Sequence, residues 1–169
     1  GAGAVGYLSV QIALLEGARV ITTVSGRNAA ERMRALGAEP VDRKAGDVAD
    51  LVLTMNDGKA VDRIVEVDFA ANRVTDARLI SLNGTIASYS SSSDPSPQLA
   101  YYDFASKGIN LRFIQGFALS PKARAEGEAW IAAHPLNIPI AATFPLEQCA
   151  DAHEHVERSS TFGQTLLSI

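Results

Sequence analysis

The sequence has few of the residues that build disulfides, zinc sites or membrane spans. Cys149 is the only cysteine among the 169 residues, and no second Cys or neighbouring His has the spacing of a zinc site. The apolar runs are short and interrupted by Gly, Arg or Asp, far below the ~20 residues that a transmembrane helix needs. These absences exclude an internal disulfide and favour the reducing cytoplasm.

A strong charge of one sign is also missing. Lys and Arg number 15, Asp and Glu number 19, and the net charge is −4. The two signs are interleaved, so the surface creates no field that would attract nucleic-acid phosphates or anionic lipid. We therefore expect no nucleic acid and no membrane as a partner. Hydrophobic residues make up 47% of the chain, which suffices for one domain with a sizeable core.

The motif that carries chemistry is a glycine-rich turn at the first residues. Gly1-Ala2-Gly3-Ala4-Val5-Gly6 fits G-x-G-x-x-G. In this pattern one glycine allows a tight turn, one lets the backbone approach a pyrophosphate, and one lets a helix pack closely on a strand. Apolar residues from Gly6 to Leu15 recur at helical spacing, so the turn opens a helix whose N-terminus can bind a diphosphate. A nucleoside-triphosphate loop is excluded, because no Gly-Lys-Ser/Thr follows Gly6.

Strand-like and helix-like segments alternate after this turn. We expect strands at 19–24, near Val41, and at 61–67, 85–88, 110–115, 138–143 and 164–169, and helices at 28–36, 48–55, 75–82, 121–133 and 145–156. The alternation predicts an α/β fold, a doubly wound parallel sheet of the Rossmann type. The strand that normally delivers the glycine turn is absent, so we interpret the chain as a fragment of a longer protein.

The end of the second predicted strand indicates which dinucleotide is bound. An NAD site places Asp or Glu there to bind the adenine ribose hydroxyls, as does a methyltransferase of similar fold. Here the residues are Ser25-Gly26-Arg27. No carboxylate opposes a 2′-phosphate, Ser25 can donate a hydrogen bond and Arg27 can supply positive charge. NADPH is therefore favoured over NADH, with a solvated loop cation as the other interpretation of Arg27.

Polar residues also follow the later predicted strands. In doubly wound folds the ligand lies across the carboxyl ends of the strands, which here are residues 68–72, 89–92 and 115–117. Asn72, the serines and Gln115 can hydrogen-bond a ribose or a carboxamide. Ordinary turn chemistry of Ser and Asn is the alternative.

No catalytic or metal-binding side chain is predicted. Tyr102 and Lys107 are one residue too far apart for a Tyr-x-x-x-Lys pair, which makes a surface lysine before a turn the preferred interpretation. His153 and His155 stand two apart on a predicted helix and so point to different sides. His134 precedes a proline in a predicted loop, and Cys149 stands at the start of a predicted helix. Both positions favour a structural or solvent-facing side chain over a catalytic one.

With these residues in view, the sequence resembles the zeta-crystallin-like quinone oxidoreductases of the medium-chain dehydrogenase/reductase superfamily. The resemblance covers the whole chain and rests on ordered motifs: Gly1-Ala-Gly-Ala-Val-Gly6, Gln11-Ile-Ala13, Gly17-Ala-Arg-Val-Ile21, Leu36-Gly-Ala38, Val61-Asp62, Asn83-Gly84, Pro145-Leu-Glu147, Ala152-His153-Glu154 and a final strand led by Gly163. It implies an oxidoreductase that transfers hydride from NADPH to a quinone or another activated enone. An enoyl reductase, a zinc-type alcohol dehydrogenase and a non-catalytic dinucleotide-binding module are the alternatives.

The resemblance also implies the positions of the cofactor contacts and of the domains. Together with Arg27, the expected contacts are Ala2, Gly3, Ala4, Val5, Gly6, Ser25, Arg43, Asn72, Tyr89, Ser90, Ser91, Ser92, Ile114, Gln115 and Gly116. Residues 1–137 would form the NAD(P)-binding domain, and residues 138–169 would pack on an N-terminal catalytic domain that the sequence lacks. We therefore expect the chain alone to bind cofactor weakly and to be inactive. A homodimer through the sheet edge from Asn110 to Ile114 is also implied.

Overall fold

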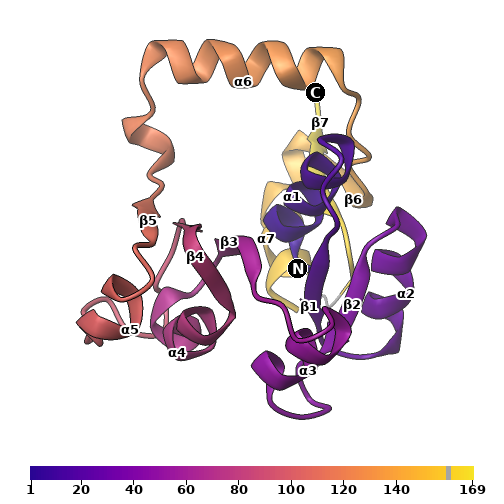
Figure 1. The fold of residues 1–169 in the computed structure, drawn as a ribbon. Coiled ribbons are helices and arrows are strands. Elements are labelled where there is room, and N and C mark those ends of the chain that lie inside the picture. The colour runs from indigo at the N-terminus through magenta and orange to yellow at the C-terminus, as the bar shows by residue number, and fades with distance from the viewer. Residues whose placement is uncertain (159–160) are drawn as a thin grey trace. The chain divides into compact units, whose positions relative to one another are not determined.

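The computed structural model describes residues 1–158 and 161–169, which form two compact units. The first unit combines Gly1–Pro40 with Ala129–Ile169, and the second is Val41–Glu128. The helices and strands, in chain order, are α1 (Ala4–Leu15), β1 (Ile21–Val24), α2 (Arg27–Leu36), β2 (Glu39–Asp42), α3 (Val48–Met55), β3 (Val61–Glu66), α4 (Phe69–Leu79), β4 (Ile80–Ser88), α5 (Tyr101–Ala105), β5 (Asn110–Phe113), α6 (Pro121–Ala133), β6 (Ile140–Pro145), α7 (Cys149–Arg158) and β7 (Gln164–Ser168) (Figure 1).

The first unit is built around α1 and β1. Its core contains Tyr7 and Val10 of α1, Val24 of β1 and Met33 of α2, with the Phe162 ring packed against them. Gly37 ends α2 in the left-handed conformation, with φ 97°, which a glycine adopts without strain. In the same unit β6 and β7 form a parallel pair.

The second unit holds a parallel sheet with the strand order β3-β4-β5. Ile64 pairs with Ile86, and Ser88 pairs with Phe113, so the carboxyl ends of the strands meet at one edge. Helix α4 packs on this sheet, and Phe69, Ile80, Ile86 and Phe104 form the core between them. The polar segments that follow β3, β4 and β5 therefore start from the same edge.

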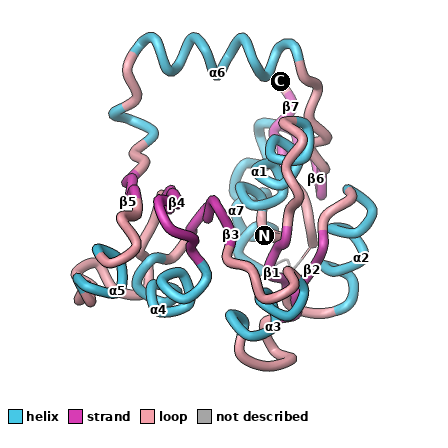
Figure 2. The backbone as a smooth tube through the Cα atoms, viewed as in Figure 1, coloured by secondary structure: helices cyan, strands magenta, loops and turns pink. Residues whose placement is uncertain are grey.

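The predicted alternation of helices and parallel strands is confirmed (Figure 2). Local boundaries differ by a few residues in several elements. The strand expected from residue 19 begins at Ile21, and the strand expected at 138–143 spans Ile140–Pro145. Pro145, expected to start a helix, ends β6; a 3₁₀ turn at Leu146–Gln148 precedes α7.

The helix predicted at 75–82 exists, but its bounds are wrong at both ends. Helix α4 covers Phe69–Leu79, and β4 begins at Ile80, which is completely buried. Asn83 adopts φ 59° within β4, and a Cβ on Gly84 would lie 2.6 Å from the Ile80 side chain. Asn83-Gly84 therefore shapes a strand against a buried isoleucine, although the same pair is typical of a helix end. The short helix α5 was not predicted.

Within residues 1–158 and 161–169, no helix is both long enough and apolar enough to cross a bilayer.

Candidate dinucleotide-binding site

The glycine turn places the open N-terminal end of α1 at the surface. Gly3 is the N-cap of α1, and the first helical hydrogen bond runs from Tyr7 N to the Gly3 carbonyl, over 2.8 Å. The N–H groups of residues 4–6 therefore have no acceptor within the helix. Gly3, Ala4 and Val5 are exposed, so this end of the helix can receive an anion.

The three glycines of the turn have different surroundings. A Cβ on Gly6 would lie 2.5 Å from the Gly1 carbonyl oxygen, and a Cβ on Gly1 would collide with the Thr22 side chain. A Cβ on Gly3 would meet nothing within 4 Å. Gly1 and Gly6 are thus needed for packing, whereas Gly3 keeps space open beside the helix end. This arrangement fits a pyrophosphate at the turn.

Ser25 and Arg27 lie at the end of β1, in the same unit as the turn. The amino group of Gly1 donates to the Thr23 carbonyl, so the turn lies against β1 two residues before Ser25. Gly26 adopts φ 88° as the N-cap of α2, and Arg27 is the first residue of that helix. Both Ser25 and Arg27 are exposed. The first unit therefore brings together Ala2, Gly3, Ala4, Val5, Gly6, Ser25 and Arg27.

The other expected contacts belong to the second unit, where Asn72 and Tyr89 meet at Glu66. The Asn72 amide donates to Glu66 Oε1 over 2.9 Å, and Tyr89 N donates to the Glu66 carbonyl over 3.0 Å. Burial, with the charge of Glu66, raises the pKa of the Tyr89 hydroxyl. Glu66 was not predicted as a site residue, because it lies within the predicted strand and not among the residues that follow it.

The serine loop binds the first turn of α4. Phe69 N donates to the Ser90 carbonyl over 3.1 Å, and Ala70 N donates to the Ser91 hydroxyl over 3.2 Å. Ser92 donates to Asp68 over 3.5 Å, and the hydroxyl of Ser93 does so over 2.8 Å. These bonds, above all from the Ser93 hydroxyl, hold the pKa of Asp68 below its usual range. Ser90, Ser91 and Ser92 thus have structural partners as well as an expected cofactor role.

The segment after β5 reaches the same edge of the sheet. Ile114 N donates to the Ser88 carbonyl over 2.7 Å, and Gln115 precedes a 3₁₀ turn that begins at Gly116. Arg43, another expected cofactor contact, lies in the same unit, in the turn between β2 and α3. Because Ser88 ends β4, the structure brings Ile114 to the start of the Tyr89 segment and thereby assembles a polar edge around Glu66.

A buried pair of carboxyl groups lies beneath this edge. Glu66 and Asp76 are 5% and 4% exposed. Burial, with the charge and the hydrogen bonding of Glu66, raises the pKa of Asp76 to about 8. The sequence pattern did not indicate this pair, because Asp76 is ten residues from Glu66 and only the packing of α4 on β3 brings the two together.

The side chains that were set aside as catalysts have structural contacts. Lys107 is partly buried, and its ammonium donates to the carbonyls of Ala77 and Ile80 over 2.6 and 2.8 Å, whereas Tyr102 is 80% exposed. His134 stacks on Trp130. Across the described ranges, no three or more His, Cys, Asp or Glu residues gather in a way that could hold a metal ion.

Comparisons with known proteins agree with this architecture. The family model for zinc-binding dehydrogenases matches residues 36–167. A search of curated proteins found no match.

Three solved structures are similar over nearly the whole chain. An NAD-dependent alcohol dehydrogenase is 25% identical with a TM-score of 0.82, covering 100% of this chain and 49% of its own. A quinone oxidoreductase from Pseudomonas syringae pv. tomato DC3000 is 26% identical with a TM-score of 0.79, covering 99% and 54%. A 2-haloacrylate reductase is 25% identical with a TM-score of 0.86, covering 97% and 54%.

The present chain thus spans about half the length of these proteins. The part that they share with it carries the glycine turn, the strand-helix alternation and the polar edge of the second unit. With the family model matching residues 36–167, the chain belongs to the zinc-binding dehydrogenases of the medium-chain dehydrogenase/reductase superfamily, which use NAD(H) or NADP(H).

Proposed function

We propose that the chain binds NADPH and serves an oxidoreductase that transfers hydride to a quinone or an activated enone. The cofactor proposal rests on one combination in the first unit. The N-terminal end of α1 is exposed, and no Asp or Glu directly follows β1. Gly3 keeps space for a pyrophosphate at α1, and Ser25 and Arg27 follow β1 with no carboxylate between them. A 2′-phosphate beside Arg27 would gain a charge-assisted hydrogen bond.

The substrate class is supported by the names of two relatives. One is a quinone oxidoreductase and another a 2-haloacrylate reductase, so both act on acceptors with an activated double bond. When bound, the nicotinamide supplies the hydride. The residues of this chain would hold and orient the cofactor, and we assign no side chain to proton transfer, because positioning of donor against acceptor supplies much of such a catalytic effect.

An NAD-dependent alcohol dehydrogenase is the competing function, because a solved structure of that name is equally similar. The two differ in substrate and cofactor. NADPH oxidation with quinones by the protein that contains this chain would support our proposal. Turnover of alcohols with NAD, or of enoyl thioesters but not quinones, would replace it. Binding without turnover of any of these would indicate a non-catalytic dinucleotide-binding module.

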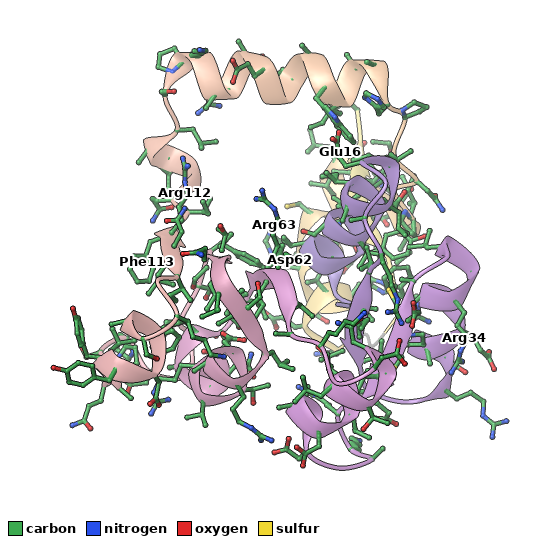
Figure 3. The ribbon with its side chains drawn as sticks, viewed as in Figure 1. Glu16, Arg34, Asp62, Arg63, Arg112 and Phe113 are labelled. Atoms are coloured by element: carbon green, nitrogen blue, oxygen red, sulfur yellow. The ribbon has the colours of Figure 1, made fainter. Side chains whose placement is uncertain are left out.

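The role of Arg27 is tested by reversing its charge. We expect Arg27→Glu to weaken NADPH binding by about tenfold or more, since a carboxylate would repel the 2′-phosphate, and to leave NADH binding unchanged or stronger, since it can accept from the ribose hydroxyls. Nicotinamide fluorescence measures both affinities. Arg34→Glu is the matched control, because Arg34 is exposed on the last turn of the same helix (Figure 3). Wild-type NADH binding about tenfold tighter than NADPH binding would contradict the role of Ser25 and Arg27.

We further propose a homodimer through β5. This strand is at the edge of the β3-β4-β5 sheet, and Phe113, which projects from it, is 70% exposed (Figure 3). Pairing of two such edges would bury the ring and satisfy open backbone groups. Light scattering should give twice the chain mass for the wild type, and Leu111→Pro should reduce it to a monomer, because proline removes a strand donor. A monomeric wild type would refute the dimer.

A further inference from the structure

In the buried carboxyl pair of Glu66 and Asp76, the Glu66 carboxyl accepts hydrogen bonds from N–H donors. Glu66 Oε1 accepts from the Asn72 amide over 2.9 Å and from the Asp68 backbone N–H. Glu66 Oε1 therefore already accepts from two N–H donors. The Glu66 carbonyl also receives Tyr89 N. Glu66 thereby connects β3, the first turns of α4 and the segment after β4.

Asp76 has the opposite surroundings. Its Oδ2 atom is buried, and no donor in the described part of the chain reaches it. Asp76 lies on α4, which packs on β3, and the Glu66 carboxyl is the polar group whose charge and hydrogen bonding act on it. Two ionised carboxylates in contact and away from water repel strongly, and a proton between them removes that repulsion. Asp76 is therefore the group that carries the proton, because Glu66 already accepts two N–H donors.

We propose that Glu66 and Asp76 share one proton and that the protonated pair positions Asn72 and the Tyr89 segment for the dinucleotide. Glu66 is in this sense a positioning residue, and Asp76 keeps it in place by donating to it. This inference rests on the proposed cofactor role of Asn72 and Tyr89. It adds that cofactor binding depends on the protonation of a group that does not touch the cofactor.

Within the described part of the chain, no ion pair involves Glu66 or Asp76. Three positive side chains around α4 are bound to other groups: Arg78 to Asp47 and Asp50 at α3, Lys107 to the carbonyls of Ala77 and Ile80, and Arg73 to the carbonyls of Gln98 and Ala70. Arg63 of β3 is exposed, and three residues from Glu66 it points to the opposite face of the strand. The charge of Glu66 acts on Asp76 and also on the Tyr89 hydroxyl. Asp68 is a further carboxylate nearby, and it accepts hydrogen bonds from Ser92 and Ser93.

Loss of the proton should therefore disturb the site at mildly alkaline pH. The pKa of Asp76, raised to about 8, lies above the ordinary value of the same group in an unfolded chain. The folded protein consequently keeps a proton that the unfolded chain releases, and stability falls as pH rises from about 4 to about 8. Above that range both carboxyls are charged, Glu66 is repelled, and Asn72 loses its acceptor.

The test uses Asp76→Asn, which keeps a donor toward Glu66 and removes the titration. Asp62→Asn is the control, since Asp62 is an exposed carboxylate on the same strand (Figure 3). Three measurements are made on the protein that contains this chain and on each of its variants: the infrared carbonyl stretch of a protonated carboxylic acid at about pH 7, the melting temperature from about pH 5 to pH 9, and NADPH affinity over the same range.

We expect the acid stretch in the wild type and in Asp62→Asn but not in Asp76→Asn. The wild-type melting temperature should fall as pH rises toward 8, and wild-type NADPH affinity should drop about tenfold between about pH 7 and pH 9, as one pKa unit of coupling gives. Asp76→Asn should flatten both curves. A wild type without the acid stretch at pH 7 overturns the shared proton, whether or not the variant folds.

The outcomes separate this inference from the proposed function. NADPH binding that is tight and equally pH-independent in the wild type and in Asp76→Asn would overturn the positioning role alone. Absence of NADPH and NADH binding in the wild type, with the acid stretch present, would overturn the proposed function and with it the positioning role, while the shared proton would stand.

Discussion

The two regions expected to touch the dinucleotide are built by opposite means. In the first unit, the glycine turn works through missing side chains, because Gly3 leaves open space and the end of α1 presents its backbone N–H groups. In the second unit, the polar edge works through buried side chains, because Glu66 holds Asn72 and the Asp68 N–H. The turn should therefore be sensitive to added volume, and the polar edge to lost or added charge.

The largest effect that tests this contrast is expected at Gly6. Gly6→Val would drive its side chain into the Gly1 carbonyl, 2.5 Å from the position of a Cβ, and displace the turn from β1. We expect a loss of about 3 kcal/mol in the free energy of unfolding, as overpacking of a tight contact produces, with loss of dinucleotide binding. Urea denaturation and nicotinamide fluorescence measure the two effects.

Gly3→Val is the matched control for that experiment. A Cβ at Gly3 meets nothing within 4 Å, and the backbone there is extended, with φ −79°, so folding should be unaffected. Dinucleotide affinity should still fall, because the added side chain occupies the space left for the pyrophosphate. Equal destabilisation by the two variants would show that the glycines do not have the separate roles that their surroundings indicate.

The difference between the regions also explains what could be predicted from the sequence. The glycine turn is a local feature: its three glycines lie within one motif, and the helix that follows has a plain apolar spacing. The strand end at Ser25 is equally local. The start of α1 and the position of β1 were therefore predictable to within a few residues.

The polar edge depends on contacts between distant residues, and there the sequence pattern was insufficient. Asp68, Asn72 and the serines were expected near the cofactor as strand-end residues, but Glu66, the partner of Asn72, was not. Glu66 lies within the predicted strand and not after its end, and Asp76 lies in a helix whose start was misplaced by several residues. Burial of both acids follows from the packing of α4 on β3, which no local pattern encodes.

Lys107 provides the smallest test, at the opposite end of α4 from the polar edge. Its ammonium donates to the carbonyls of Ala77 and Ile80 at the C-terminal end of α4. Lys107 lies 27 residues after Ile80 in the sequence. Lys107→Met keeps most of the aliphatic length and leaves these carbonyls without that donor. We expect a loss of about 1.5 kcal/mol in unfolding free energy, the size of a hydrogen bond from a charged group.

Lys122→Met is the control for this last experiment, since Lys122 is 85% exposed and its ion pair with Glu126 spans 3.8 Å. Such surface pairs contribute little, so its unfolding free energy should stay within about 0.5 kcal/mol of the wild type. Dinucleotide affinity should be unchanged in both variants, because Lys107 contacts the end of α4 and not the residues around Glu66. A drop in affinity for Lys107→Met with unchanged stability would return Lys107 to the candidates for the functional site and remove its structural role.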